Sequence, residues 1–125
     1  ETAAISNTAA ASNLLTDLRA LGCHIAIDDF GTGMQSFERL QQLPIDLVKI
    51  DGTFVRNVAH NARDRDLVQA MVTIARAYQA ETIAEYVEDA DILAALEPLQ
   101  VDWIQGYHIG RPVPLSALDL APAGA

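Results

Sequence analysis

Polar residues that can take part in metal or acid–base chemistry stand at the ends of four short apolar runs. They are Asp28 and Asp29, Lys49 and Asp51, Glu85, and Gln105. A buried strand has no structural need for an acid at its end, so the repetition is more informative than any single case. In parallel α/β folds, ligands and reactions are found at the carboxyl ends of the strands. The sequence therefore predicts one shared site built from separate segments.

The adjacent acids Asp28 and Asp29 predict binding of a divalent metal ion. Neighbouring carboxylates repel each other unless a cation compensates, and an all-oxygen ligand set suits Mg²⁺ or Mn²⁺. Two such ions about 4 Å apart can activate a water and neutralise a phosphodiester. Each residue also has an ordinary structural explanation. The aspartates can accept hydrogen bonds in the Gly31–Gly33 turn, Lys49 can be a solvated strand-end lysine, and Glu85 can be a first-turn helix acid.

The alternation of segment types predicts an α/β fold. Helical spacing of apolar residues predicts helices over 14–21, 37–43, 64–78 and 89–96, and short apolar runs predict strands over 23–27, 47–50, 82–84 and 101–104. Strands that alternate with helices are parallel and joined by right-handed crossovers. An eight-stranded barrel has about 30 residues per strand–helix unit, so four units correspond to half a barrel. An open doubly wound sheet of this length is the alternative.

Composition and charge limit the classes of function. The chain has 125 residues, of which 50% are hydrophobic, and its formal net charge is -9, which argues against binding a DNA or RNA polymer. A phosphate-bearing ligand would need a bridging cation. No apolar stretch approaches the roughly 20 residues that span a bilayer. The lone Cys23 is expected to be buried in a reducing compartment, which indicates a cytoplasmic location. Any membrane anchor of the parent protein is expected upstream. Trp103 is also expected in the core.

Several motifs together resemble the second half of EAL domains, from about residue 1 to residue 115. They are Ile27-Asp28-Asp29-Phe30-Gly31-Thr32-Gly33, Leu43-Pro44-Ile45-Asp46, Val48-Lys49-Ile50-Asp51, Ile83-Ala84-Glu85 with Val87-Glu88, Gln105-Gly106-Tyr107 and Gly110-Arg111-Pro112. The resemblance implies the C-terminal half of a TIM-like (β/α)8 barrel, whose fifth to eighth strands are those predicted above. Residues 116–125 are expected to form a frayed tail.

The resemblance also implies an activity, the metal-dependent hydrolysis of cyclic di-GMP to linear pGpG. In that family the acids matching Asp28 and Asp29 hold two Mg²⁺ or Mn²⁺ ions. The residue matching Lys49 contacts the nucleophilic water or the metal site. The residue matching Glu85 contributes to the metal site, positions the water and takes its proton, and the residue matching Gln105 orients the edge of the last strand.

Other matching residues are expected to bind substrate or to support the loop after the first predicted strand. They are Glu1, Phe30, Gly31, Thr32, Gly33, Asp51 and Glu88. The loop is expected to couple metal binding to dimer contacts, and Glu1 is expected to brace it. Two positions depart from the family: Tyr86 replaces a usual glycine, and Met34-Gln35 stands where Tyr-Ser is common.

The remaining metal ligands of the family lie in the N-terminal half of the barrel, upstream of residue 1. The isolated 125 residues are therefore expected to be inactive, and to form a homodimer or a larger association through exposed strand edges. A degenerate domain that binds cyclic di-GMP without cleaving it is the alternative function. A phospho-receiver domain is disfavoured, because Lys49 follows Asp28 by only 21 residues.

Overall fold

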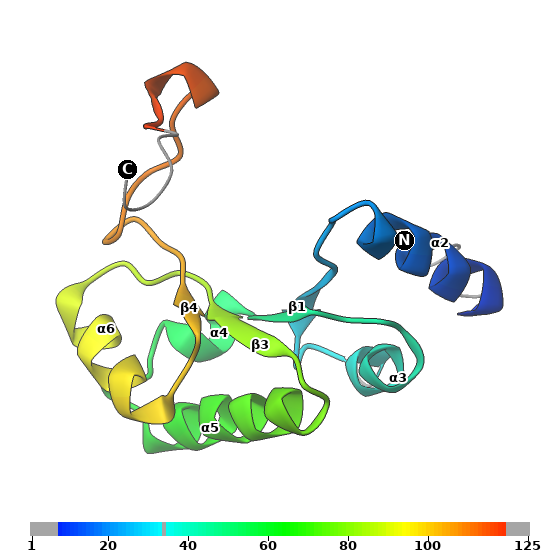
Figure 1. Ribbon diagram of the computed structural model, residues 1–125. Helices are drawn as coiled ribbons and strands as arrows, with labels where there is room; N and C mark the ends of the chain where they lie inside the picture. The colour runs from blue at the N-terminus through cyan, green and yellow to red at the C-terminus, as the bar shows by residue number, and fades with distance from the viewer. Residues whose placement is uncertain (1–7, 34, 120–125) are drawn as a thin grey trace.

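The computed structural model describes residues 8–33 and 35–119 (Figure 1). Four parallel strands form one sheet in the order β1 (Ala26–Phe30), β2 (Leu47–Ile50), β3 (Glu81–Ala84) and β4 (Trp103–Ile104). The helices are α2 (Thr8–Ala20), α3 (Gln35–Gln42), α4 (Gly52–Val55), α5 (Ala62–Ala77) and α6 (Ala90–Leu96), with short 3₁₀ turns at Glu97–Leu99 and Leu115–Ala117. The predicted α/β class is confirmed.

The hydrophobic core lies between the sheet and the helices that follow its strands. Val48 and Ile50 of β2 are fully buried, and so are Val68 and Ala75 of α5. Figure 1 shows α5 running along one side of the sheet. Because side chains of a strand alternate between its two faces, Lys49 lies on the face opposite this core. The sheet face that carries Lys49 is therefore the face available for a polar site.

The structure corrects the predicted position of the first strand. The strand was expected over 23–27 but is observed at Ala26–Phe30, so Asp28 and Asp29 lie inside β1 rather than after it. Cys23 is exposed, contrary to the expectation of a buried thiol. Cys23 was predicted to begin the first strand, but β1 begins at Ala26, so Cys23 lies outside the sheet. The predicted strand over 47–50 is confirmed as β2.

The structure departs from the prediction at two further places. Trp103 was expected in the core but is 57% exposed, since it lies in β4, an edge strand of the described sheet. Its indole Nε1 donates a hydrogen bond to Oε2 of Glu81, at 2.8 Å. The four-residue helix α4 was not predicted, although Asp51 caps it by accepting a hydrogen bond from the backbone N–H of Thr53.

Some expectations fall on residues outside the described ranges. Glu1 and the end of the predicted tail, residues 120–125, are among them. None of the helices within residues 8–33 and 35–119 has the length and apolar character needed to cross a lipid bilayer.

Candidate metal and catalytic site

An irregularity in β1 places two acids opposite one lysine. Ile27 pairs with Val48 and Phe30 pairs with Ile50, so two residues of β1 stand opposite the single residue Lys49. Those two residues are Asp28 and Asp29. Such a β-bulge bends the strand and re-aims its side chains. Asp29 has a φ of 53°, in the left-handed region, and both acids are exposed between buried neighbours.

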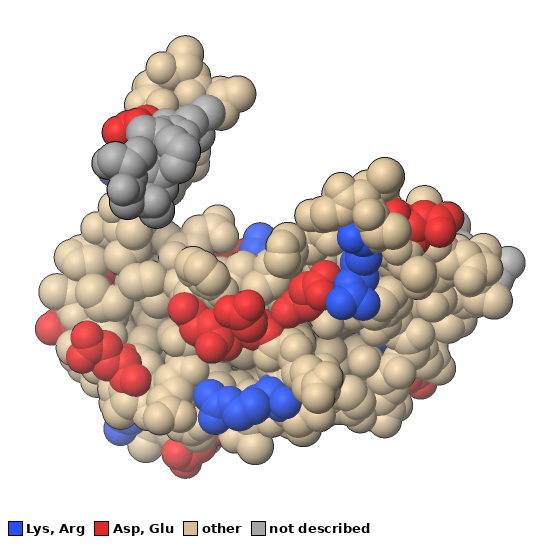
Figure 2. All heavy atoms as spheres, in the orientation of Figure 1, with Lys and Arg blue, Asp and Glu red and all other residues tan. Residues whose placement is uncertain are grey.

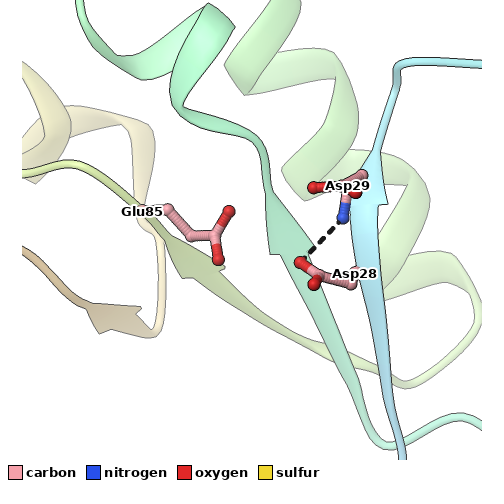
Figure 3. A group of neighbouring side chains, drawn as sticks. All are labelled: Asp28, Asp29 and Glu85. Atoms are coloured by element: carbon pink, nitrogen blue, oxygen red, sulfur yellow. Dashed lines mark hydrogen bonds between the residues drawn. The ribbon is translucent and has the colours of Figure 1, made fainter.

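Three carboxylates from two strands come together beside this bulge. Oxygen atoms of Asp28, Asp29 and Glu85 lie within 4.8 Å of one another. Figure 3 shows Asp28 and Asp29 on β1 and Glu85 at the end of β3, with β2 between them. The backbone N–H of Asp29 donates to Oδ1 of Asp28 at 3.0 Å, and the backbone N–H of Glu85 donates to the carbonyl of Ile50 at 3.2 Å. Backbone contacts thus fix both sides of the cluster.

Lys49, the single lysine of the sequence, supplies positive charge at the centre of this cluster. Its Nζ lies 2.9 Å from Oε1 of Glu85 and 3.9 Å from Oδ1 of Asp28. The hydrogen bond with Glu85 raises the pKa of Lys49 above its ordinary value, against a lowering effect of partial burial. The lysine is therefore charged at neutral pH. The side chain of Glu85 is only 13% exposed, whereas that of Asp28 is 61% exposed.

The acids remain under mutual repulsion despite this lysine. The negative charge of Asp28 is the main cause that raises the pKa of Asp29 above its ordinary value, with smaller contributions from burial, Asp51 and Glu85. A hard divalent cation favours oxygen ligands and would relieve this repulsion. The three carboxylates therefore fit such an ion in both donor type and charge. Figure 2 shows acidic side chains gathered in the middle of one face of the molecule, in line with the net charge of -9.

Asp51 lies next to the cluster and has a separate structural role. Its carboxylate accepts hydrogen bonds from the backbone N–H of Thr53, at 2.9 Å, and from the Thr53 hydroxyl. These bonds lower the pKa of Asp51 below its ordinary value, and the hydrogen bond with Asp29 and the charge of Arg56 act in the same direction. Asp51 therefore connects the acid cluster to the start of α4.

The loop after β1 carries the remaining residues of the first motif. Phe30 is fully buried and its ring packs 5.7 Å from that of Phe37, which makes it a core residue that anchors the loop. The backbone N–H and the hydroxyl of Thr32 both donate to the carbonyl of Asp29, at 3.2 and 2.7 Å. Gly31 has a φ of +95°, and a Cβ there would lie 2.6 Å from Cε of Met71. The loop therefore requires glycine at this position.

Gln105 and Glu88 lie in a cleft beside the acid cluster rather than within it. The cleft has a volume of ≈ 340 Å³ and is lined by Glu85, Tyr86, Glu88, Gln105, Gly106 and Tyr107. Glu85 belongs to both the cluster and the cleft, so the two form one continuous site. Sequence reasoning predicted the cluster residues but gave Tyr86 no role, although its unusual identity after Glu85 was visible.

The chain belongs to the EAL domain family, because the family's model matches residues 1–112. A curated relative, the cyclic di-GMP phosphodiesterase PdeB of Shewanella oneidensis, is 44% identical over 117 residues. That alignment covers 94% of this chain but only 14% of the relative. The chain thus spans a small part of the curated relatives' length.

Solved EAL structures agree with the observed fold. The EAL domain of DcpA from Mycobacterium smegmatis aligns with a TM-score of 0.81 and 33% identity, covering 86% of this chain and 48% of that one. The PaMucR phosphodiesterase in complex with c-di-GMP aligns with a TM-score of 0.78 and 36% identity, covering 90% of this chain and 46% of that one. The predicted fold, part of a TIM-like barrel with four parallel strands, is confirmed by these alignments.

Proposed function

We propose that this chain supplies the second half of the active site of an EAL phosphodiesterase, which hydrolyses cyclic di-GMP to linear pGpG. The convergence of Asp28, Asp29 and Glu85 around Lys49 is the observation that supports this most directly. Relatives named as cyclic di-GMP phosphodiesterases support the proposed substrate and reaction class. An N-terminal half of the barrel, carrying further metal ligands, completes the proposed site.

Asp28, Asp29 and Glu85 are the residues that would hold Mg²⁺ or Mn²⁺. When bound, the cations would lower the pKa of a water and offset the negative charge of the phosphodiester. All three residues offer carboxylate oxygens, the ligands that these ions prefer. The loop Phe30–Gly33 is proposed to support this arrangement from outside the cluster. The same role is proposed for Glu1, which lies outside the described residues.

Glu85 and Lys49 are the proposed acid–base pair. Glu85 accepts the proton of the attacking water, whose oxygen bonds to phosphorus while one phosphorus–oxygen bond to ribose breaks. The leaving ribose oxygen takes up a proton from solvent and becomes the free hydroxyl of the linear product. Lys49, 2.9 Å from Glu85, forms an ion pair with that carboxylate and offsets charge at the phosphate. Gln105 and Glu88 line the adjoining cleft, whose volume suits part of a dinucleotide, so we assign them to substrate binding.

The test is a cleavage assay with cyclic di-GMP on the complete domain, with and without Mn²⁺. Wild-type protein should release pGpG only with the metal ion. Asp28→Asn should lower kcat by about 10²-fold or more, the scale seen when electrostatic stabilisation is removed. Binding of cyclic di-GMP by wild-type protein without any release of pGpG would instead identify a receptor or scaffold domain.

We also propose the cytoplasm as the location of this domain and a homodimer as its assembly. A single cysteine excludes an internal disulfide, which suits a reducing compartment. We propose that the loop after β1 links the metal site to the dimer contacts. Residues 116–125 are proposed to lie outside the functional domain.

A further inference from the structure

Tyr86 has a conformation that bulky side chains rarely adopt. Its φ is 61°, in the left-handed region, directly after Glu85. For a residue other than glycine, asparagine or aspartate this region costs about 1–2 kcal/mol, so contacts elsewhere must hold it. The backbone on either side is hydrogen-bonded to a neighbouring segment: Glu85 donates to the carbonyl of Ile50, and Val87 donates to the carbonyl of Gln105 at 3.0 Å.

The ring of Tyr86 makes the contacts that hold this conformation. It packs on the first residue of α4, where a Cβ on Gly52 would lie 2.1 Å from Cδ2 and 2.6 Å from Cγ of the tyrosine. The guanidinium of Arg56, one helical turn further, lies over the ring at 4.4 Å from its centroid. A cation over an aromatic face contributes about 0.5–1 kcal/mol at exposed sites. Glycine at position 52 is therefore required for the ring to approach.

These contacts join the ends of two neighbouring strands. Gly52 follows Asp51 at the end of β2, and Tyr86 follows Glu85 at the end of β3. The ring thus links the segment after Lys49 to the segment that carries Glu85. Without the ring, residue 86 can relax toward an ordinary φ, which rotates the preceding peptide and moves the Glu85 carboxylate relative to Lys49.

We propose that Tyr86, held by Gly52 and Arg56, is a positioning residue that fixes Glu85 against Lys49. The inference rests on the proposed function for its effect on turnover. Tyr86 contacts neither the acid cluster nor Lys49 in any recorded hydrogen bond or ion pair among the described residues. The proposed route of its effect on Glu85 is the backbone of residues 85–87.

The test compares Tyr86→Ala, which removes the ring, with Tyr86→Phe, which keeps it. In the complete domain, Tyr86→Ala should lower kcat for cyclic di-GMP about ten-fold or more, while KM changes less than about two-fold; misplacing a catalytic group has effects of this order. Tyr86→Phe should keep kcat much closer to the wild-type value than Tyr86→Ala does. Gln79→Ala is the matched control, because Gln79 also has a φ of 61° but lies before β3, away from the site.

Gly52→Ala tests the same contact from the helix side. The added methyl collides with the ring, so this variant should reproduce the loss of kcat seen in Tyr86→Ala. Combining the two changes should lower kcat no further than Tyr86→Ala alone, because the methyl then has no ring to displace. Additive losses in the double variant would overturn the proposed contact.

Hydrogen exchange in metal-free protein gives a readout that does not depend on turnover. Amides of residues 85–87 should exchange about ten-fold faster in Tyr86→Ala and at the wild-type rate in Tyr86→Phe and Gln79→Ala, since local opening governs exchange. Wild-type kcat in Tyr86→Ala, or a raised KM with unchanged kcat, would overturn the positioning role. If wild-type protein does not cleave cyclic di-GMP, the proposed function fails, and the exchange rates still decide whether Tyr86 orders this segment.

Discussion

Lys49 and the three carboxylates around it form a cluster in which negative charges outnumber the single positive charge. One ammonium group faces Glu85 and Asp28 directly, while Asp29 lies further along the bulge. The acids raise the pKa of the lysine, and Asp28 raises the pKa of Asp29. Both shifts have the direction expected of a site that lacks positive charge. A bound divalent cation should therefore reverse both.

Metal binding should lower the pKa of Lys49. A cation held by Asp28, Asp29 and Glu85 offsets the charges that raise this pKa, so the ammonium loses a proton at lower pH than in the metal-free protein. The measurement is a pH titration of the methyl signals of ¹³C-dimethylated Lys49, assigned by their loss in Lys49→Arg, with and without Mg²⁺. An identical titration curve in the two conditions would contradict metal binding at these carboxylates.

The candidate residues could be predicted from the sequence, but their arrangement could not. Asp28 and Lys49 lie within strands, and Glu85 directly follows one, and the approximate positions of these strands follow from apolar runs and intervening helices. The bulge that sets Asp28 and Asp29 opposite Lys49 leaves no mark in a pattern of hydrophobicity, because it depends on pairing with β2. The fixed position of Tyr86 similarly depends on contacts with a helix distant in sequence.

At the scale of elements, β2 was predicted at its observed bounds, β3 and α6 to within one residue, and α5 to within two residues. Leu47–Ile50 is a continuous apolar run apart from Lys49, and α5 has a broad apolar face over four turns. The helix α4 was missed because four residues are too few for a periodic pattern. The capping sequence Asp51-Gly52-Thr53 was the available signal, since aspartate is a favoured N-cap residue.

Removing the cap of α4 should make stability depend less on pH. Asp51 has a folded-state pKa below its ordinary value of 3.8, so its stabilising effect is present above that value and is lost as pH falls through the folded-state pKa. Asp51→Ala should lower the free energy of unfolding by about 1 kcal/mol at pH 7 and by less at lower pH. Urea unfolding of wild type and Asp51→Ala, from pH 7 down to acid pH, measures this difference in the free energy of unfolding.

Asp51→Asn serves as the control for this prediction. Asparagine keeps a side-chain oxygen that can cap the helix but has no proton to titrate. This variant should lie closer to wild type than Asp51→Ala at pH 7. If the loss of unfolding free energy in Asp51→Ala stays constant down to acid pH, the charge of Asp51 does not contribute to stability.

The two glycines of the loop after β1 should respond differently to alanine. Gly31→Ala forces a Cβ to within 2.6 Å of Met71 at a φ of +95°, whereas a Cβ on Gly33 meets nothing within 4 Å. Gly31→Ala should lower the free energy of unfolding by about 1–3 kcal/mol, and Gly33→Ala by less than about 0.5 kcal/mol. Denaturant midpoints of the complete domain measure both. Equal midpoints for the two variants would contradict the described loop.

Parts of the described sheet and of the surface around it are not covered by the helices of this chain. β1 and β4 are the edge strands of the described sheet. A hollow of ≈ 250 Å³ beside β1 is lined mainly by apolar residues, among them Leu14, Leu15 and Ile27. Large apolar side chains are also exposed along the segment after β4, which extends away from the sheet in Figure 1. These surfaces suit a neighbouring half-barrel.

The isolated 125 residues should therefore associate. Unpaired strand edges and apolar surface favour contact between copies when no other chain segment covers them. Light scattering over a range of concentrations should show species larger than a monomer. Adding the first half of an EAL barrel should shift the population toward a defined complex, and a stable monomer at all concentrations would contradict the expectation.

The most direct test of the central claim is the turnover of cyclic di-GMP by Glu85→Gln in the complete domain with Mn²⁺. Glutamine keeps the size of the side chain but can neither accept a proton nor pair with the charge of Lys49. Glu81→Gln is the matched control, because Glu81 is the first residue of β3, whereas Glu85 directly follows the last. The account predicts that Glu85→Gln lowers kcat by about 10²-fold or more, while Glu81→Gln keeps wild-type kcat. Wild-type turnover in Glu85→Gln would contradict it.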